Sequence, residues 1–122
     1  MKYRLKKAQQ EDIQRMSISM TSYLGLYALQ HRGQESAGIA FSDGYKIRHH
    51  KGLGLVRRVF SDPRIIRGLQ GSSFIGHNRY STRVGTVISN AQPFVIRFKS
   101  GQIAAARNGN IVNAPALRKI ME

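Results

Sequence analysis

The sequence contains no cysteine and only six acidic residues among 122. Without cysteine these residues can form no disulfide and supply no thiol, and cysteine usage leaves the cellular compartment open. No apolar run approaches the roughly 20 residues of a membrane-spanning helix, and residues 1–15 are basic and polar, unlike a secretory signal. These absences exclude a disulfide framework, and we expect a cytoplasmic chain with no membrane partner.

The shortage of acidic residues leaves 20 Lys and Arg against six Asp and Glu, a formal net charge of +14. Clustered basic residues can bind nucleic acid by displacing counterions from phosphates. Here they form only small groups, at residues 2–7 and 57–58, without the interleaved aromatic residues typical of RNA binding. We therefore expect a solvated basic surface and no nucleic-acid partner. The alternative is weak, sequence-independent binding to polyanions, which weakens steeply with salt.

The length fits one domain of moderate size, and its first regular element is predicted to be a helix. We expect this helix to start near Tyr23, with Thr21 or Ser22 as its N-cap and Gly33 as a left-handed stop. Residues 1–20 then form a lead-in, and the domain occupies residues 21–122. The alternative is that apolar residues at helical spacing between 13 and 20 extend the same helix backward.

Short apolar or alternating runs separated by turn residues predict several strands. The expected hairpins cover residues 36–48, turning at 42–44, and residues 94–106, turning at 99–101, with a further strand over 72–76. Glycines at 52 and 54 are expected to break the chain before residues 55–60 and a short helical piece at 63–69. A last helix follows Asn113, with Pro115 in its first turn. The pattern predicts an α+β layered domain.

Two polar stretches follow short apolar runs and carry the chemistry, at residues 76–82 and 108–110. A β-rich scaffold places functional groups in such loops. Arg79 offers a planar fork for a carboxylate, and Asn108 with the Gly109 amide offers two donors for an oxyanion. Taken singly, Arg79 is more often a surface arginine, and Asn-Gly is more often a hairpin turn. Together they indicate acyl transfer on an amino-acid-like substrate.

Other polar residues have plain structural interpretations. His77 fits a structural histidine, and Arg32 before Gly33 fits a residue that complements the end of a helix dipole. The pair His49 and His50 is expected in a solvated loop. No second cluster of ligands at zinc spacing accompanies this pair, so we expect no metal site in the chain.

Several separated motifs, in order, resemble those of one enzyme family. They read YLGLYALQHRGQESAGIA at residues 23–40, GHNRYST at 76–82, NAQPF at 90–94 and NGNIVNA at 108–114. The chain from about Tyr23 onward is similar to the type 2 glutamine amidotransferase (glutaminase) domain of amidophosphoribosyltransferases, which begin de novo purine synthesis. The resemblance implies an N-terminal-nucleophile hydrolase fold, present in part: the first strand and the C-terminal part of the domain are expected to be missing.

The resemblance also implies roles for individual residues. Arg79 is expected to bind the α-carboxylate of glutamine, with Thr82 beside it. Arg32 is expected to lie close to the nucleophile and order the site, and Asn108 and Gly109 are expected to form the oxyanion hole. The resemblance allows a homo-oligomer. It implies no cofactor in this chain, because phosphoribosyl pyrophosphate and Mg²⁺ bind the family's transferase domain.

The chain departs from the family pattern in three places. The family's nucleophile is an N-terminal cysteine whose own α-amino group acts as the base. Family spacing places that cysteine near Lys7, which cannot replace it. The alternative nucleophile is the hydroxyl of Ser17, if cleavage before this residue made it the N-terminus. Arg107 stands where the family usually has histidine, and the chain stops before the family's later aspartate that helps to bind the α-amino group.

Two hypotheses follow from these departures. The chain is either a fragment of an amidophosphoribosyltransferase, inactive by itself, or a non-catalytic remnant that binds glutamine, a partner or polyanions. An upstream segment carrying the missing cysteine would favour the first hypothesis.

Overall fold

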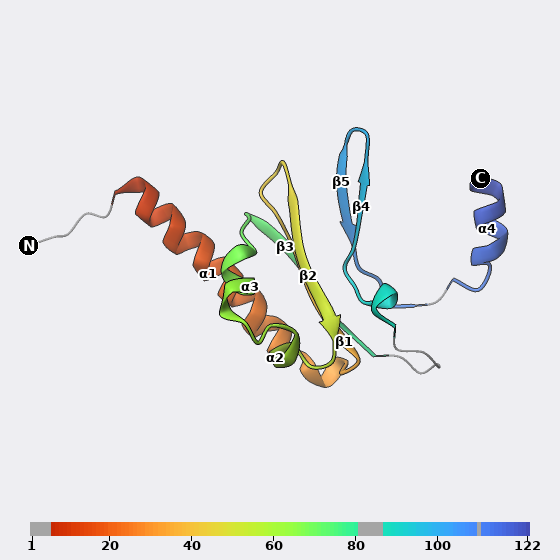
Figure 1. Ribbon diagram of the computed structural model, residues 1–122, viewed down its shortest axis with the longest axis horizontal. Coiled ribbons are helices and arrows are strands. Elements are labelled where there is room, and N and C mark those ends of the chain that lie inside the picture. The colour runs from red at the N-terminus through yellow and green to blue at the C-terminus, as the bar shows by residue number, and fades with distance from the viewer. Residues whose placement is uncertain (1–5, 81–86, 110) are drawn as a thin grey trace, which may run out of the picture.

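The computed structural model describes residues 6–80, 87–109 and 111–122 (Figure 1). Helices and antiparallel sheets are both present, so the expected α+β class is confirmed. The helices are α1 (Lys7–Ala28), α2 (Val56–Val59), α3 (Pro63–Gly68) and α4 (Ala114–Met121), with 3-10 turns η1 (Gln30–Arg32) and η2 (Ile88–Asn90). The strands are β1 (Ser36–Ser42), β2 (Ile47–Leu53), β3 (Ser73–Arg79), β4 (Phe94–Phe98) and β5 (Gly101–Ala105).

A three-stranded antiparallel sheet in the order β2-β1-β3 forms the centre of the molecule. Helices α1, α2 and α3 lie on one side of it and the β4–β5 hairpin on the other (Figure 1). The predicted hairpin of β1 and β2 is confirmed. Its turn is fixed by Asp43, whose Oδ1 accepts the backbone N–H groups of Tyr45 and Lys46 at 2.9 and 2.7 Å.

The central strand β1 is buried on both faces, which explains its small and apolar sequence. Ala37, Ile39 and Phe41 alternate along it and join the core against the helices. Gly38 points the other way, and a Cβ there would overlap the backbone oxygen of Gln92. The core therefore lies between β1 and the helices, and the opposite face of β1 receives the chain near Gln92.

Helix α1 begins at Lys7, so the predicted start near Tyr23 is wrong and the backward extension is right. Its contact face carries serines: Ser22 Oγ donates to Ser19 O at 2.7 Å, and Ser19 Oγ donates to the carbonyl of Leu69. Small side chains bring the helix close to α3, and Leu26 is buried against the sheet. The turns before Ile18 are exposed, and residues 7–11 are strong helix formers, which explains why the helix starts as early as Lys7.

The helix also ends differently from the prediction. Gly33 is extended, with φ of −178°, and is not a left-handed stop. Its role is steric, because a Cβ at this position would overlap the backbone of Arg79. The 3-10 turn η1 carries the chain from α1 to this contact. Glycine is therefore required here for close approach of two backbones.

Three other expectations change in the structure. Strand β3 continues to Arg79, so residues 76–79 belong to a strand and only Tyr80 is described beyond it. Strand β2 runs through Gly52, with Val59 packed against that glycine. His49 and His50 therefore lie in a strand and not in a loop, and the Nε2 of His50 is 3.0 Å from Val59 O.

The predicted second hairpin is confirmed as β4–β5, and two contacts attach it to the central sheet. Gln102 Oε1 accepts the N–H of Ile47 at 2.9 Å, and Lys51 Nζ donates to Ala91 O at 2.7 Å. The predicted helices near 63–69 and after Asn113 are also present, as α3 and α4. Within the described residues, no helix combines the length and apolar character needed to cross a membrane.

Candidate functional site

Alternation along β3 separates the polar residues of the GHNR stretch onto two faces of the sheet. Asn78 faces α1, where its Nδ2 donates to Leu26 O at 2.8 Å in the last helical turn. His77 and Arg79 therefore face the opposite side. His77 pairs with Gly38, which faces Gln92, and this register agrees with the assignment. Both side chains are partly buried.

The face of β3 that carries His77 lies beside the segment that follows β5. His77 pairs with Gly38, Gly38 lies against Gln92, and the Gln92 side chain accepts the N–H of Arg107. Burial is the main reason why the pKa of His77 lies below its ordinary value; the backbone of Arg107 raises this pKa and the Arg79 charge lowers it. Since Arg79 is two residues further on the same face, it lies on the side of the sheet that carries the Arg107–Gly109 segment.

Two hydrogen bonds of Arg107 order the Arg107–Gly109 segment, one to Gln92 and one within the segment. The N–H of Arg107 donates to Oε1 of the buried Gln92 at 2.6 Å, and the Arg107 guanidinium donates to Gly109 O at 2.6 Å. Gly109 has φ of +138°, a conformation that favours glycine. The Arg107 side chain thus bonds within the loop that carries Asn108.

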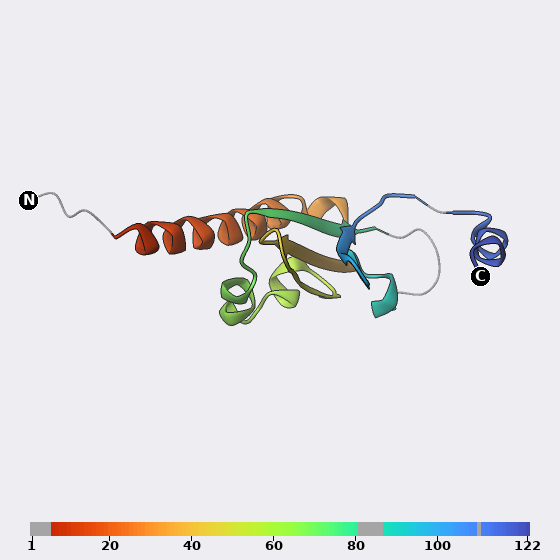
Figure 2. The same cartoon turned by 90° about the horizontal axis from the view of Figure 1, so that it is seen from above.

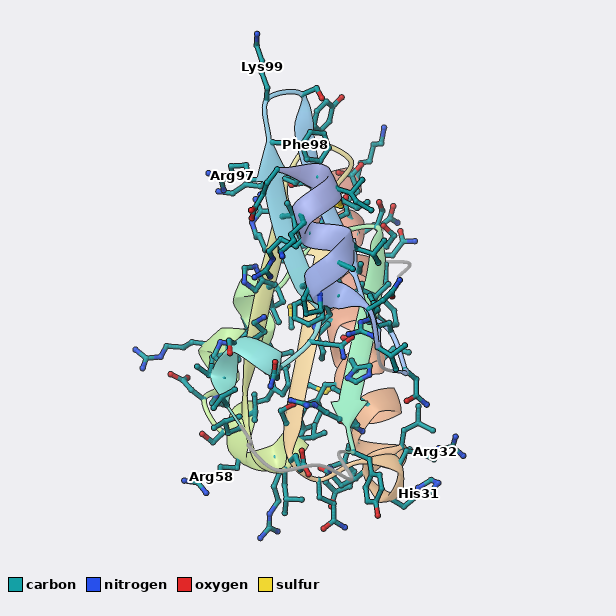
Figure 3. All side chains as sticks on the ribbon, turned by 90° about the vertical axis from the view of Figure 1, so that its right-hand side faces the viewer. His31, Arg32, Arg58, Arg97, Phe98 and Lys99 are labelled. Atoms are coloured by element: carbon teal, nitrogen blue, oxygen red, sulfur yellow. The ribbon has the colours of Figure 1, made fainter. Side chains whose placement is uncertain are left out.

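Arg32 approaches the end of β3 through the main chain. Gly33 packs on the backbone of Arg79, and Glu35 N–H donates to Arg79 O at 3.1 Å. The Arg32 side chain itself is exposed and projects away from the ribbon (Figure 3). The backbone next to Arg32 therefore lies at the end of β3, while the expected role of the Arg32 side chain in ordering the site stays a prediction.

The structure thus brings together three of the predicted elements. The backbone near Arg32 lies against Arg79, and Arg79 shares its face with the segment that contains Asn108 and Gly109. Asn108 and Gly109 are exposed, and Asn-Gly is not a hairpin turn here, since β5 ends at Ala105 and the next described element is α4. Thr82, expected beside Arg79, lies outside the described residues.

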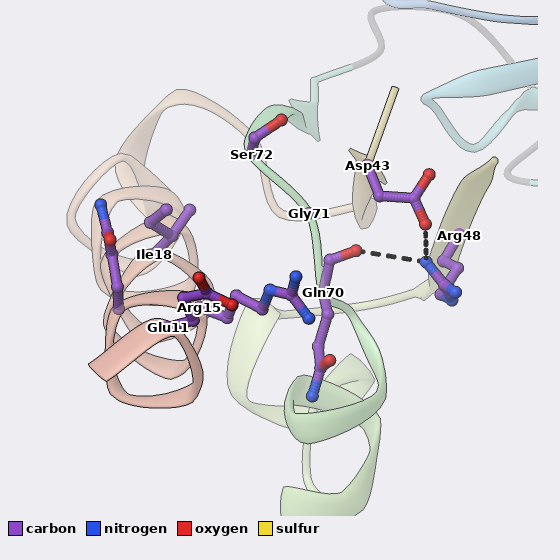
Figure 4. A pocket seen from close by; sticks show the side chains of 9 residues that line it. Glu11, Arg15, Ile18, Asp43, Arg48, Gln70, Gly71 and Ser72 are labelled. Carbon is purple, nitrogen blue, oxygen red and sulfur yellow. Dashed lines mark hydrogen bonds and ion pairs between the residues drawn. The ribbon is translucent and has the colours of Figure 1, made fainter. Parts of the chain in front are cut away.

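A separate hollow lies away from these residues, between α1 and the β1–β2 turn (Figure 4). It has a volume of about 300 Å³, and its charged lining residues are Glu11, Arg15, Asp43 and Arg48. Arg48 Nη1 pairs with Asp43 Oδ2 at 2.7 Å, which holds the pKa of the Asp43 carboxyl far below its usual range. Both groups are thus occupied with each other, and the hollow has none of the predicted site residues.

Two residues that organise the site received no role from the sequence. Gln92 belongs to the NAQPF motif, yet nothing local reveals that its amide binds a backbone N–H 15 residues later. Asn78 lies within GHNRYST, and its function is to cap the distant helix α1. Their positions inside the two recognised motifs were the signal in the sequence that could have indicated a role for Gln92 and Asn78. Within the described part of the chain, no three His, Asp or Glu side chains are grouped to hold a metal ion.

Comparison with known proteins identifies relatives along most of the chain. An amidophosphoribosyltransferase of Synechococcus elongatus is 52% identical over 102 residues, which cover 84% of this chain and 20% of that protein. One from Methanocaldococcus jannaschii is 48% identical over 109 residues, covering 89% of this chain and 23% of the relative. The chain is homologous to one part of the amidophosphoribosyltransferases. The resemblance of its motifs to this family is confirmed.

Solved structures agree with the sequence relatives. A structure of the allosteric regulatory enzyme of purine biosynthesis matches with a TM-score of 0.74 and 43% identity, over 84% of this chain and 22% of that chain. The glutamine phosphoribosylpyrophosphate amidotransferase of B. subtilis, complexed with ADP and GMP, matches with a TM-score of 0.72 and 42% identity over the same shares. No protein-family model matches the chain. The chain spans about a fifth of the length of the curated amidophosphoribosyltransferases it matches.

Proposed function

We propose that this chain forms the glutamine-recognition part of an amidophosphoribosyltransferase glutaminase site. The observation that carries the proposal is the shared face of β3: His77 and Arg79 lie on the side of the sheet where Gln92 accepts the N–H of Arg107. A guanidinium and the Asn108–Gly109 donors are thereby on one side of the sheet. The similarity to the glutamine phosphoribosylpyrophosphate amidotransferase of B. subtilis, at 42% identity, supports the choice of glutamine as ligand.

Arg79 is the proposed clamp for the α-carboxylate. Its backbone is fixed on two sides, by pairing with Ser36 in β1 and by the packing of Gly33. A guanidinium held in this way presents two parallel N–H donors to a carboxylate, and such charge-assisted bonds are worth roughly 1.5–3 kcal/mol. Thr82 is proposed to lie beside the same carboxylate, and Arg32 to order the entrance.

Asn108 and Gly109 are the proposed oxyanion hole. The side-chain amide of Asn108 and the N–H of Gly109 would donate to the oxygen that becomes negative when the glutamine amide is attacked. Such donors act only if their positions are fixed beforehand. The bonds from Arg107 to Gln92 and to Gly109 hold the segment in this way.

The chain itself supplies no thiol for this reaction. Lys7, at the position expected for the nucleophile, is the first residue of α1, and the 22 residues of this helix span about 33 Å at 1.5 Å per residue. The C-terminal end of the helix, not Lys7, lies next to β3. Ser17 is about 16 Å along the helix from Ala28 by the same rise, so neither side chain takes the place of the cysteine.

In the whole protein, we propose that ammonia released from glutamine reacts with phosphoribosyl pyrophosphate to give 5-phosphoribosylamine. The residues of this chain would bind glutamine and stabilise the oxyanion, while the thiol and the acceptor site come from other residues. The layering of helices, sheet and hairpin supports an N-terminal-nucleophile hydrolase arrangement for the complete domain (Figure 1).

Titration of the 122-residue chain with glutamine, followed by calorimetry or NMR, tests the proposal. We expect saturable binding that Arg79→Gln weakens about 10- to 100-fold, which is the range expected for a lost charge-assisted bond. The matched control is Arg97→Gln, because Arg97 is exposed on β4 and projects from the hairpin (Figure 3). Glutamine methyl ester, which has no free α-carboxylate, is expected to bind weakly to the unaltered chain.

Ammonia release is measured in the same samples, and we expect none above that from glutamine in buffer. Equal glutamine affinities of Arg79→Gln and Arg97→Gln would refute the proposed clamp. Ammonia release by the purified chain would show that a residue other than cysteine acts as its nucleophile.

A further inference from the structure

Helix α1 packs on the fold with one face and leaves a second, apolar row of side chains exposed. The packed face contains Ser19, Ser22 and Leu26, which are buried. A second row of large apolar side chains runs along the helix beside it and is about half exposed. We call this row the outer stripe, and its exposed fractions are Ile13 56%, Met16 58%, Met20 49%, Leu24 54% and Tyr27 48%.

The outer stripe is nearly uncharged in a strongly basic chain. Between residues 13 and 27 the one charged side chain is Arg15, whereas the whole chain has a net charge of +14. Arg15 lies by the hollow beside the β1–β2 turn and not in the outer stripe (Figure 4). Two copies of this chain repel each other over most of their surfaces. The outer stripe is therefore a surface on which they can approach.

The spacing of the outer stripe is symmetric about its centre. Its residues are separated by three, four, four and three positions, so a two-fold axis at Met20 maps the row onto itself. We propose that α1 docks antiparallel on α1 of a second copy of this chain. In this arrangement Ile13 faces Tyr27 of the other copy, Met16 faces Leu24, and Met20 faces Met20.

The geometry of α1 permits this approach. Its N-terminal half extends beyond the end of the strands, so the far part of the helix stands clear of the sheet (Figure 2). Apolar residues repeating at three and four positions form the seam of paired helices, which cross at about 20°. Methionines near the centre, Met16 and Met20, adapt their shape to the facing side chains.

The size of the outer stripe sets the strength of the association. Five large side chains about half exposed form an apolar patch on the order of several hundred Å², larger than scattered surface residues present. Two such patches bury roughly 1,000 Å² when they meet, at the low end of specific interfaces. We therefore expect a reversible dimer. Because the copies carry like charges elsewhere, added salt should strengthen it, unlike an interface held by ion pairs.

Charge substitutions at facing positions test the pairing in sedimentation equilibrium of the full chain. Met16→Glu and Leu24→Lys should each weaken the dimer by more than about tenfold, because each buries unpaired charge. The double variant Met16→Glu/Leu24→Lys should recover much of the loss, since each carboxylate then faces an ammonium of the other copy. A mixture of the two single variants should likewise form a heterodimer. Thr21→Glu, exposed on another side of α1, should leave the dimer unchanged.

These outcomes distinguish the proposed partner from others. A monomer at all concentrations and salt levels overturns the proposal. A double variant that associates more weakly than either single variant excludes the antiparallel pairing. Far-ultraviolet circular dichroism of each variant separates loss of association from loss of the helix. The outer stripe contains none of the proposed glutamine ligands, so the result is independent of glutamine binding.

Discussion

Removing the side-chain oxygen of Gln92, which accepts the N–H of Arg107, should loosen the proposed oxyanion segment while leaving the fold intact. Gln92→Met keeps the length of the side chain and removes Oε1, which accepts the N–H of Arg107 at 2.6 Å. A buried donor left without a partner costs about 1–3 kcal/mol. Arg107 is an exposed residue, so water can reach its freed N–H, and we expect the low end, about 1 kcal/mol.

Amide hydrogen exchange measures this change at the residue concerned. A loss of about 1 kcal/mol corresponds to exchange about fivefold faster at the Arg107 amide. Gln102→Met is a matched control, because the Oε1 of Gln102 accepts the N–H of Ile47 at 2.9 Å on the other side of the hairpin. We expect Gln92→Met to affect Arg107 and not Ile47, and Gln102→Met to do the reverse.

Two results would refute the reasoning. Unchanged exchange at Arg107 in Gln92→Met would mean that this hydrogen bond does not hold the segment. Equal acceleration at Arg107 in both variants would mean that the hairpin opens as one unit. If the segment does loosen as expected, glutamine affinity should fall in Gln92→Met more than in Gln102→Met.

Two further changes test the core and the pH dependence of stability. Phe41→Ala should lower the free energy of unfolding, measured in urea, by about 3–5 kcal/mol, because Phe41 is fully buried. The control Tyr45→Ala removes a side chain that is 99% exposed and should change the free energy of unfolding by less than about 0.5 kcal/mol. Burial lowers the pKa of His77 and of His49 in the folded chain below the ordinary 6.5. As the pH drops below about 6.5, the unfolded chain therefore takes up protons before the folded chain does. The free energy of unfolding then falls until the pH reaches the lowered pKa values. The urea midpoint should therefore fall less between pH 7.5 and 5.5 in His77→Gln than in the unaltered chain. His31 is exposed, and His31→Gln should not reduce this fall. Equal pH profiles for the two variants would contradict the assignment to His77.

The sequence predicted those elements whose signals are local. Alternating runs and the turn at Asp43 specified the β1–β2 hairpin, and the turn before Gly101 specified β4–β5. The order of the motifs along the chain indicated the family. In each case the information lies within a few adjacent residues or in residue identity itself.

Helix α1 shows where one local signal misled. Residues 7–11 are strong helix formers and Gln9 accepts the N–H of Lys6, but the cap candidates at residues 21 and 22 favoured a later start. The position of the helix on the core is fixed from a distance, through Ser19 on Leu69 and Leu26 under Gly76. Contacts between residues about 50 positions apart cannot be read from either segment alone.

For the site, residue types in the sequence determined which chemistry is available: a guanidinium at Arg79, amide donors at Asn108 and Gly109, and no thiol. Only the tertiary structure decided which of these groups share a side of the sheet. That depends on the register of β3 against β1, which turns Asn78 toward α1 and His77 with Arg79 toward Arg107. A shift of one residue in this register would exchange the two faces, and pairing between distant strands fixes it.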